Sequence, residues 1–247
     1  MMNTTSKTAL VTGSSSGIGY AVAREFLAKG WNVVLNGRNE ERLREAARKL
    51  GSAAQLATVA GSTSAASTGE SMVRTARERF GGVDVLVNNA GEFAGKPFLD
   101  VSAQDLDHYL DVNLKGTYFT TQAAVREMIK QGRGGSVVNI TTVLIDHSMS
   151  WVTATAPLIT KGAIRALTVL LAGELAPHDI RVNAVAPGFV LTPLMDGANL
   201  ERLASAATVQ RVGEADEISS AVRFLAESSF ITGHVMNVDG GFVTSRR

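Results

Sequence analysis

The feature that most constrains the fold is a regular alternation of short strand-like runs with segments of helical periodicity along the whole chain. Most of these runs are apolar at both odd and even positions, as expected for parallel strands that are covered on both faces. The predicted strands cover residues 8–12, 32–36, 55–59, 83–88, 136–141, 180–185 and 235–238. This alternation predicts an α/β fold with a doubly wound parallel sheet of about seven strands and helices on both faces.

Apolar stripes at helical spacing predict the amphipathic helices that would cover the sheet. The stripes are Ile18, Val22 and Phe26; Ile164, Leu167, Leu171 and Leu175; and Ile218, Val222 and Leu225. Ser102 precedes another periodic segment and is predicted to cap its N-terminus, with Asp105 in the first turn.

The composition is that of a globular chain with no obvious macromolecular partner. The chain has 247 residues, of which 45% are hydrophobic and 19% charged, and this balance predicts one domain over residues 1–247. A formal net charge of +1 gives no electrostatic reason to expect binding to nucleic acid or to an anionic membrane. We expect no bilayer-spanning segment, and because residues 1–6 are few and polar, we expect no signal peptide.

The cysteine and histidine content narrows the chemistry further. The chain contains no cysteine, which excludes disulfides and thiolate catalysis and favours a cytoplasmic location. The histidines lack the spacing of metal ligands, so we expect no metal site. They are His108, His147, His178 and His234.

A glycine-rich turn follows the first predicted strand, where ligands bind in open parallel sheets. Residues 12–19 read Thr-Gly-Ser-Ser-Ser-Gly-Ile-Gly and open a helix. Glycine allows a tight turn and a close approach of the backbone to a diphosphate, and the helix N-terminus attracts phosphate. The residues expected to contact the ligand are Gly13, Ser15, Ser16, Gly17, Ile18 and Gly19. The strand–turn–helix context favours a dinucleotide on a Rossmann-type domain over the alternative, a glycine-rich turn without a ligand.

The same turn resembles the T-G-x-x-x-G-I-G pattern of the short-chain dehydrogenase/reductase family, and four further motifs follow in the family's order. They are residues 88–91 (Asn-Asn-Ala-Gly), 111–113 (Asp-Val-Asn), 187–192 (Pro-Gly-Phe-Val-Leu-Thr) and 238–241 (Val-Asp-Gly-Gly). The five motifs cover nearly the whole chain, so the resemblance is specific for the family and its fold and less so for its activity.

The resemblance implies roles for individual residues of these motifs. Three residues after the fourth predicted strand would form a wall of the cofactor cleft, namely Asn89, Ala90 and Gly91. Asn113 would hold a proton-relay water. A later stretch would contact the nicotinamide and its ribose through Pro187, Gly188, Val190 and Thr192.

The end of the second predicted strand favours NADP(H) over NAD(H). No carboxylate, which would accept hydrogen bonds from the ribose and repel a 2′-phosphate, stands there, whereas Arg38 could pair with that phosphate. The alternative is that Arg38 is a solvated surface residue. Many relatives that prefer NADPH carry a second basic residue in the glycine turn, where this chain has Ser16, and Gly61-Ser62 replaces the family's usual aspartate near the adenine.

The catalytic positions match the family only in part. The family uses a serine, a tyrosine, a lysine four residues after the tyrosine, and an asparagine; the lysine lowers the tyrosine pKa so that the tyrosine can pass a proton. Lys161 matches the lysine, which in the family also contacts the nicotinamide ribose. Counting back four residues gives Pro157, which has no proton to donate but fits the first turn of a helix. The tyrosines are Tyr20, Tyr109 and Tyr118, and we expect them to pack or lie on the surface.

The serine position and the loop after it are altered as well. The fifth strand ends in Thr141-Thr142, and Thr142 is our candidate for the hydroxyl that bonds a substrate oxygen. The interval from Thr142 to Pro157 is 157 − 142 = 15 residues, longer than usual for the family, and it contains His147. His147 either supplies a proton near neutral pH or is simply a polar residue of a loop.

Two functions remain open on sequence grounds. The first is an NADP-dependent oxidoreductase that acts on a small carbonyl compound or alcohol with a substituted proton donor. The second is a protein that retains the dinucleotide for sensing or assembly. A substrate loop is expected at about residues 194–213, where Met195, Leu200 and Leu203 could line a pocket or pack a helix. The resemblance also implies a homotetramer or homodimer.

Overall fold

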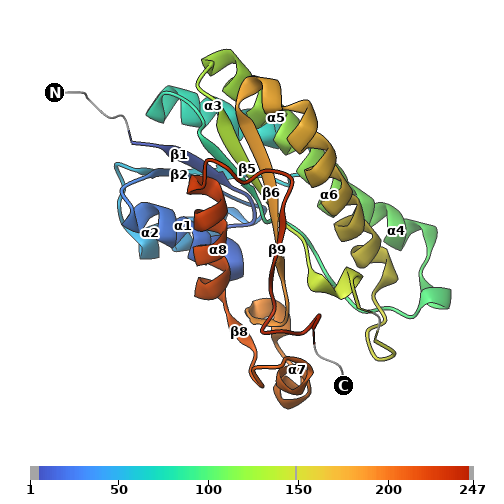
Figure 1. The fold of residues 1–247 in the computed structure, drawn as a ribbon. Coiled ribbons are helices and arrows are strands. Elements are labelled where there is room, and N and C mark those ends of the chain that lie inside the picture. Colours follow the sequence, from blue (N-terminus) through green and yellow to red (C-terminus); the bar gives the residue numbers. More distant parts are fainter. Residues whose placement is uncertain (1–5, 148, 245–247) are drawn as a thin grey trace.

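The computed structural model describes residues 6–147 and 149–244, and it contains the predicted sheet (Figure 1). Seven parallel strands pair in the order β3-β2-β1-β4-β5-β6-β9. They are β1 (Thr8–Val11), β2 (Asn32–Gly37), β3 (Leu56–Ala60), β4 (Val85–Asn88), β5 (Gly135–Ile140), β6 (Ile180–Pro187) and β9 (Val235–Val238). Each predicted strand overlaps one of these, so the predicted fold class is confirmed. The expectation about a signal peptide concerns residues 1–6, of which 1–5 lie outside the described residues.

Helices cover both faces of the sheet. They are α1 (Gly17–Ala28), α2 (Glu40–Leu50), α3 (Ala66–Phe80), α4 (Ala103–Tyr109), α5 (Gly116–Gln131), α6 (Thr155–Glu174), α7 (Leu200–Ala206) and α8 (Ala215–Glu227). One face packs against α1, α2 and α8, and the other against α3, α5 and α6. A separate pair of two-residue strands, β7 (Val190–Leu191) and β8 (Gly213–Glu214), lies beside α7 (Figure 1).

The two cores follow from the alternation of side chains along buried strands. In β1, Ala9 and Val11 point into the core beneath α1 and α8, whereas Leu10 points into the core beneath α3 and α5. The same division holds in β4, where Val85 and Val87 face one side and Leu86 the other. Strands that must be apolar on both faces therefore read as continuous hydrophobic runs.

Two of the three predicted helix stripes are confirmed and the third is partly wrong. The stripes of α1 and α8 pack into the core. Along α6, Ile164 and Leu175 are buried and the half-buried Leu171 packs against the same core, whereas Leu167 does not and Thr168 and Ala172 are buried beside them. Thr168 can face the sheet because its hydroxyl is fully hydrogen-bonded. Its Oγ1 donates to Ile164 O (2.8 Å) and accepts from Asn139 Nδ2 (2.9 Å).

The apolar composition of α6 also bears on the membrane question. Among the described residues, α6 is the one helix long and apolar enough, by length and composition, to cross a bilayer. The expectation that no segment of the chain is long and apolar enough is therefore wrong for this helix. The helix packs against β6 and α4 as part of the layer on one face of the sheet. Its apolar residues are thus accounted for by that packing and by an exposed outer face.

The helical segment formed by α4 and α5 begins at a predicted N-terminal cap and is interrupted by a turn that was not predicted. Ser102 Oγ accepts from Asp105 N, and the Asp105 carboxylate accepts from Ser102 N, so the predicted cap is confirmed as a capping box. Between α4 and α5 the chain forms a π-helical turn over Leu110–Lys115. Such turns are rare and often occur at functional sites. This one contains Asn113.

Candidate active site

The strand order reverses between β1 and β4, so the crevice beyond their carboxyl ends is the expected ligand site. The glycine turn lies there, and it leaves no room for side chains. A Cβ on Gly13 would come within 2.8 Å of Ala90 Cα, and one on Gly19 within 2.5 Å of Asn89 Nδ2. Gly13 and Gly17 also have positive φ angles of 62° and 56°. The glycines are therefore required by the backbone path as well as by any ligand.

Thr12 fastens the end of β4 to this turn. Its Oγ1 accepts from both Asn89 N and Ala90 N at 2.9 Å, while Asn89 Nδ2 donates to Thr12 O and Gly13 O at 3.0 Å. Two of the three predicted cleft-wall residues thus join the glycine turn in one unit. The sequence placed Thr12 before the first glycine of the turn, but it did not predict that its hydroxyl binds Asn89 and Ala90.

The start of α1 suits a bound diphosphate. Within the described residues, Ser16 occupies the N-cap position without forming a side-chain capping bond, and the first turn contains no acidic residue. The first N–H groups of a helix have no partners within the helix, so these remain available to an anion. Gly17 lies under Thr192, whose Cβ would be 3.4 Å from a Cβ at Gly17. The predicted nicotinamide-contacting stretch therefore reaches the same crevice.

The nicotinamide-contacting stretch, residues 187–192, is held in place at its first two residues and at Val190. Pro187 ends β6, and Gly188 packs so tightly that a Cβ there would lie 2.8 Å from Asp239 Cα. Gly188 N donates to Val238 O at 3.0 Å. Val190 is buried and pairs with Gly213 in the small sheet. The motif at residues 238–241 thus supports the stretch from the neighbouring strand.

Asn113 and Lys161 converge on Gly91. A Cβ at Gly91 would lie 3.3 Å from both Asn113 Oδ1 and Lys161 Nζ, so these predicted residues are brought together. Asn113 is fully buried, and its Nδ2 donates to Thr160 Oγ1 at 3.1 Å. Lys161 Nζ donates to Ile140 O at 2.9 Å, at the carboxyl end of β5. Desolvation lowers the pKa of Lys161 to about 8, because an ammonium is less stable away from water.

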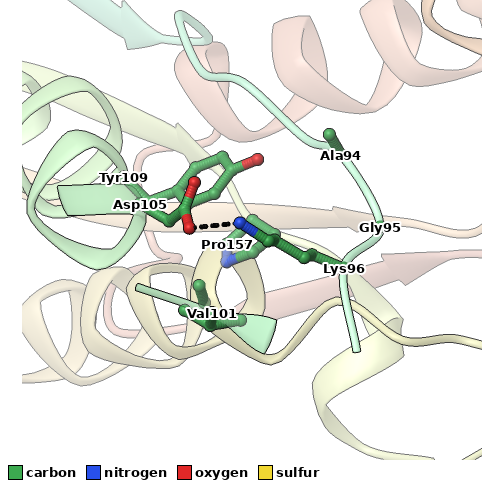
Figure 2. A pocket seen from close by; sticks show the side chains of 8 residues that line it. Ala94, Gly95, Lys96, Val101, Asp105, Tyr109 and Pro157 are labelled. Atoms are coloured by element: carbon green, nitrogen blue, oxygen red, sulfur yellow. Dashed lines mark hydrogen bonds and ion pairs between the residues drawn. The ribbon is translucent and has the colours of Figure 1, made fainter. Parts of the chain in front are cut away.

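Pro157 lies in the first turn of α6, buried beside a cavity of about 140 Å³. Figure 2 shows that the Tyr109 ring and the Lys96–Asp105 ion pair flank the same cavity. Lys96 Nζ lies 2.5 Å from Asp105 Oδ2. Tyr109 is thus a phenol close to the position that lacks one. Sequence reasoning did not foresee this, because α4 and α6 meet only in the folded chain.

Thr142 is half-buried at the end of β5 and faces the nicotinamide-contacting stretch. Its Oγ1 donates to Pro187 O at 3.4 Å and accepts from Leu144 N at 3.3 Å. Both bonds are long, so the hydroxyl caps the following turn while remaining available to a better partner.

His147 lies apart from the Asn113–Lys161 pair. Its exposed ring meets the Phe242 ring edge-on, with 5.5 Å between centroids. Among the residues that the structure describes, no hydrogen bond joins His147 to Asn113 or Lys161. The adjacent Asp146 forms an ion pair with Arg165 of α6, which anchors this side of the loop.

Arg38 is exposed at the surface, with 62% of its side chain accessible, and it has an acidic partner there. It forms an ion pair with Glu92, which follows the cleft-wall motif. Glu92 Oε2 also lies 2.7 Å from His108 Nε2. Burial by itself would raise the pKa of Glu92, but the hydrogen bond with His108 and the charge of Arg38 outweigh it and lower that pKa.

Comparison with known proteins agrees with this geometry. Residues 13–243 match the family model described as Enoyl-(Acyl carrier protein) reductase. An L-rhamnose 1-dehydrogenase (NAD(P)(+)) of Azotobacter vinelandii is 38% identical, covering 95% of this chain and 96% of the relative. A 3-oxoacyl-[acyl-carrier-protein] reductase of Synechocystis sp. is 33% identical, covering 97% of this chain and 98% of the relative. A short-chain type dehydrogenase/reductase from Mycobacterium marinum superimposes with a TM-score of 0.91 at 30% identity, covering 96% of each chain. The chain therefore belongs to the short-chain dehydrogenase/reductase family of NAD(P)-dependent oxidoreductases.

Proposed function

We propose that this protein interconverts a small carbonyl compound and the corresponding alcohol, that it favours NADP(H) over NAD(H), and that its proton donor is not a tyrosine. The relatives named above as an L-rhamnose 1-dehydrogenase and a 3-oxoacyl-[acyl-carrier-protein] reductase support this reaction class. Arg38, the cation that follows β2, supports the preference for a 2′-phosphate.

The observation that carries the proposal is the environment of Lys161. Its ammonium lies beside Gly91, which Asn113 also approaches, beyond the ends of β4 and β5, and its pKa is lowered to about 8. A lysine of unperturbed pKa holds its proton firmly at neutral pH, whereas this one can release it. Binding a ribose hydroxyl alone would not require such a proton-labile amine.

The residues of the crevice would hold the dinucleotide along its length. Backbone N–H groups from Ser15 to Ile18 would bind the diphosphate at the start of α1. The cleft wall and the nicotinamide-contacting stretch would border the rest, through Gly13, Gly19, Asn89, Ala90, Gly91, Pro187, Gly188, Val190 and Thr192. When bound, the dinucleotide supplies or accepts a hydride.

Proton transfer would then fall to the chain's own residues. Thr142 Oγ1 would exchange its long bond to Pro187 O for one to the substrate oxygen. Lys161 would pass its proton to that oxygen through a water held by Asn113. His147 is the second candidate donor, and to act it would have to leave the Phe242 ring. A positioned proton donor typically contributes about 10²–10⁴ in rate.

The alternative function is dinucleotide binding without turnover, in sensing or assembly. The observation that favours it is Pro157, which stands one helical turn before Lys161 and carries no proton. Asn113 and Lys161 would then contribute to binding alone.

A single set of variants separates these functions. NADPH oxidation is measured with a panel of ketones, aldehydes and imines. The proteins compared are the wild type, Lys161→Met, His147→Ala and Pro157→Tyr. Glu174→Gln, an exposed residue at the end of α6, is the control. We expect measurable wild-type turnover that Lys161→Met abolishes and the control retains. Loss of turnover in His147→Ala would identify the imidazole as the donor. Inert wild type with intact nucleotide binding, together with activity gained in Pro157→Tyr, would favour the binding function.

We further propose that residues 194–213 form the substrate loop and that the protein works as a homodimer or homotetramer in the cytoplasm. Within the loop, Leu203 is buried and packs α7, whereas Leu200 is exposed and free to meet a substrate. Apolar side chains exposed on α5 and α6 support self-association. They are Phe119, Ile129, Ile159, Val169 and Leu170. Light scattering during gel filtration of the wild type and Leu170→Glu tests this assembly.

A further inference from the structure

The ion pair between Arg38 and Glu92 spans the crevice. Arg38 follows β2 and Glu92 follows β4, and β1 lies between these two strands in the sheet. The pair therefore passes across the carboxyl end of β1, where the glycine turn begins. A dinucleotide bound on that turn has its adenosine on the β2 side of the crevice, within the reach of Arg38.

The two partners differ in how firmly they are held. The Glu92 backbone is fixed on both sides by Asn113, whose Oδ1 accepts from Glu92 N (2.8 Å) and whose Nδ2 donates to Glu92 O (3.0 Å). The Glu92 side chain is 30% exposed and that of Arg38 is 62% exposed. Glu92 is thus the more buried partner, held at its backbone, and Arg38 is the more exposed one.

The two residues form an ion pair in which the Arg38 guanidinium lies against Glu92 Oε1. Both the charge of Arg38 and its hydrogen bond lower the pKa of Glu92. The other oxygen, Oε2, lies 2.7 Å from His108 Nε2, so Glu92 has a second partner that does not depend on Arg38.

We infer that Glu92 is a specificity-determining residue that limits the preference for NADP(H) over NAD(H). This inference rests on the proposed function, because it takes Arg38 as the partner of the 2′-phosphate. NADPH must draw Arg38 away from Glu92, and its phosphate, with a charge of about −1.5 to −2, then lies near the Glu92 carboxylate. NADH carries a neutral 2′-hydroxyl in place of the phosphate, and this group neither competes for the charge of Arg38 nor is repelled by Glu92.

The test measures dissociation constants for NADPH and NADH by titration calorimetry in the wild type, Glu92→Gln and the exposed control Glu174→Gln. Glutamine keeps the shape of glutamate and can still bond His108. We expect Glu92→Gln to tighten NADPH binding by about fivefold, the size of a partly exposed charge pair, and to leave NADH binding within about twofold. The control should leave both constants unchanged.

A second background shows whether Glu92 acts through Arg38. In Arg38→Gln, the competition is gone, so adding Glu92→Gln should shift the NADPH-to-NADH ratio by less than it does in the wild type. An unchanged ratio in Glu92→Gln, or equal changes for both nucleotides, would overturn the inference while leaving the proposed function intact. If the wild type bound neither nucleotide, the proposed function itself would fail, and this inference with it.

Discussion

Asn113 holds both backbone groups of Glu92, with its Oδ1 accepting from Glu92 N at 2.8 Å and its Nδ2 donating to Glu92 O at 3.0 Å. One buried amide therefore fixes the start of the segment after Gly91. Because Asn113 itself lies in a π-helical turn, the irregular turn and the segment it holds form one structural unit.

Replacing Asn113 with leucine should destabilise the protein strongly. Leucine has nearly the same shape, but it leaves Glu92 N, Glu92 O and Thr160 Oγ1 without this partner in a buried place. We expect the free energy of unfolding to fall by at least about 2 kcal/mol, measured by urea denaturation. The matched control is Asn237→Leu on the exposed side of β9, which should change it by less than about 0.5 kcal/mol. Equal effects of the two variants would contradict the role assigned to Asn113.

Gly19 should tolerate no side chain, unlike Gly173 near the end of α6. In Gly19→Ala the new Cβ would lie 2.5 Å from both Asn89 Nδ2 and Gly13 O, so the glycine turn has to shift. We expect a loss of about 1–3 kcal/mol in stability together with weakened nucleotide binding. Gly173→Ala in α6 meets nothing within 4 Å and should stabilise the protein by about 0.5–1 kcal/mol. Thermal unfolding and nucleotide titration of both variants check the contrast, and the glycine-turn geometry would be wrong if Gly19→Ala behaved like Gly173→Ala.

Lys161 should make stability depend on pH in the alkaline range. Its pKa is lowered from 10.5 to about 8, so between these values the unfolded chain binds more protons than the folded one. Stability from this group is therefore least below pH 8, and it rises as the pH increases toward 10.5. The urea midpoints of the wild type and Lys161→Met, compared at intervals across this range, isolate the contribution because other titrations are common to both. A difference that stays constant with pH would show that the ammonium is not desolvated.

The sequence predicted the parts of this molecule that depend on local pattern. The strands follow from apolar runs such as that of β1, and the glycine turn follows from the three glycines that the backbone path requires. The family motifs implied that Asn113 and Lys161 belong to one site, and the fold adds that both lie beside Gly91.

What the sequence did not predict depends on segments that meet only in the fold. Arg38 could be read as a phosphate ligand or as a surface residue, but its partner Glu92 is far along the chain. In the same way, Tyr109 lies across a cavity from Pro157 because α4 packs on α6. The apolar pattern of α6 also placed Leu167 in the core, since a hydrogen-bonded Thr168 cannot be recognised from periodicity.

Thr12 should be essential for joining the glycine turn to the cleft wall. Its Oγ1 accepts from Asn89 N and Ala90 N, and in Thr12→Val both of these N–H groups lose their acceptor at a buried position. We expect the free energy of unfolding to fall by about 2–4 kcal/mol and nucleotide affinity to fall more than tenfold, because the wall of the crevice is released. Thr12→Ser keeps the hydroxyl and loses only a methyl group, so it should retain most of the affinity at a cost of about 1 kcal/mol. Urea denaturation and nucleotide titration of the two variants separate the hydroxyl from the methyl group: if valine supports binding as well as serine does, the hydroxyl does not hold the wall.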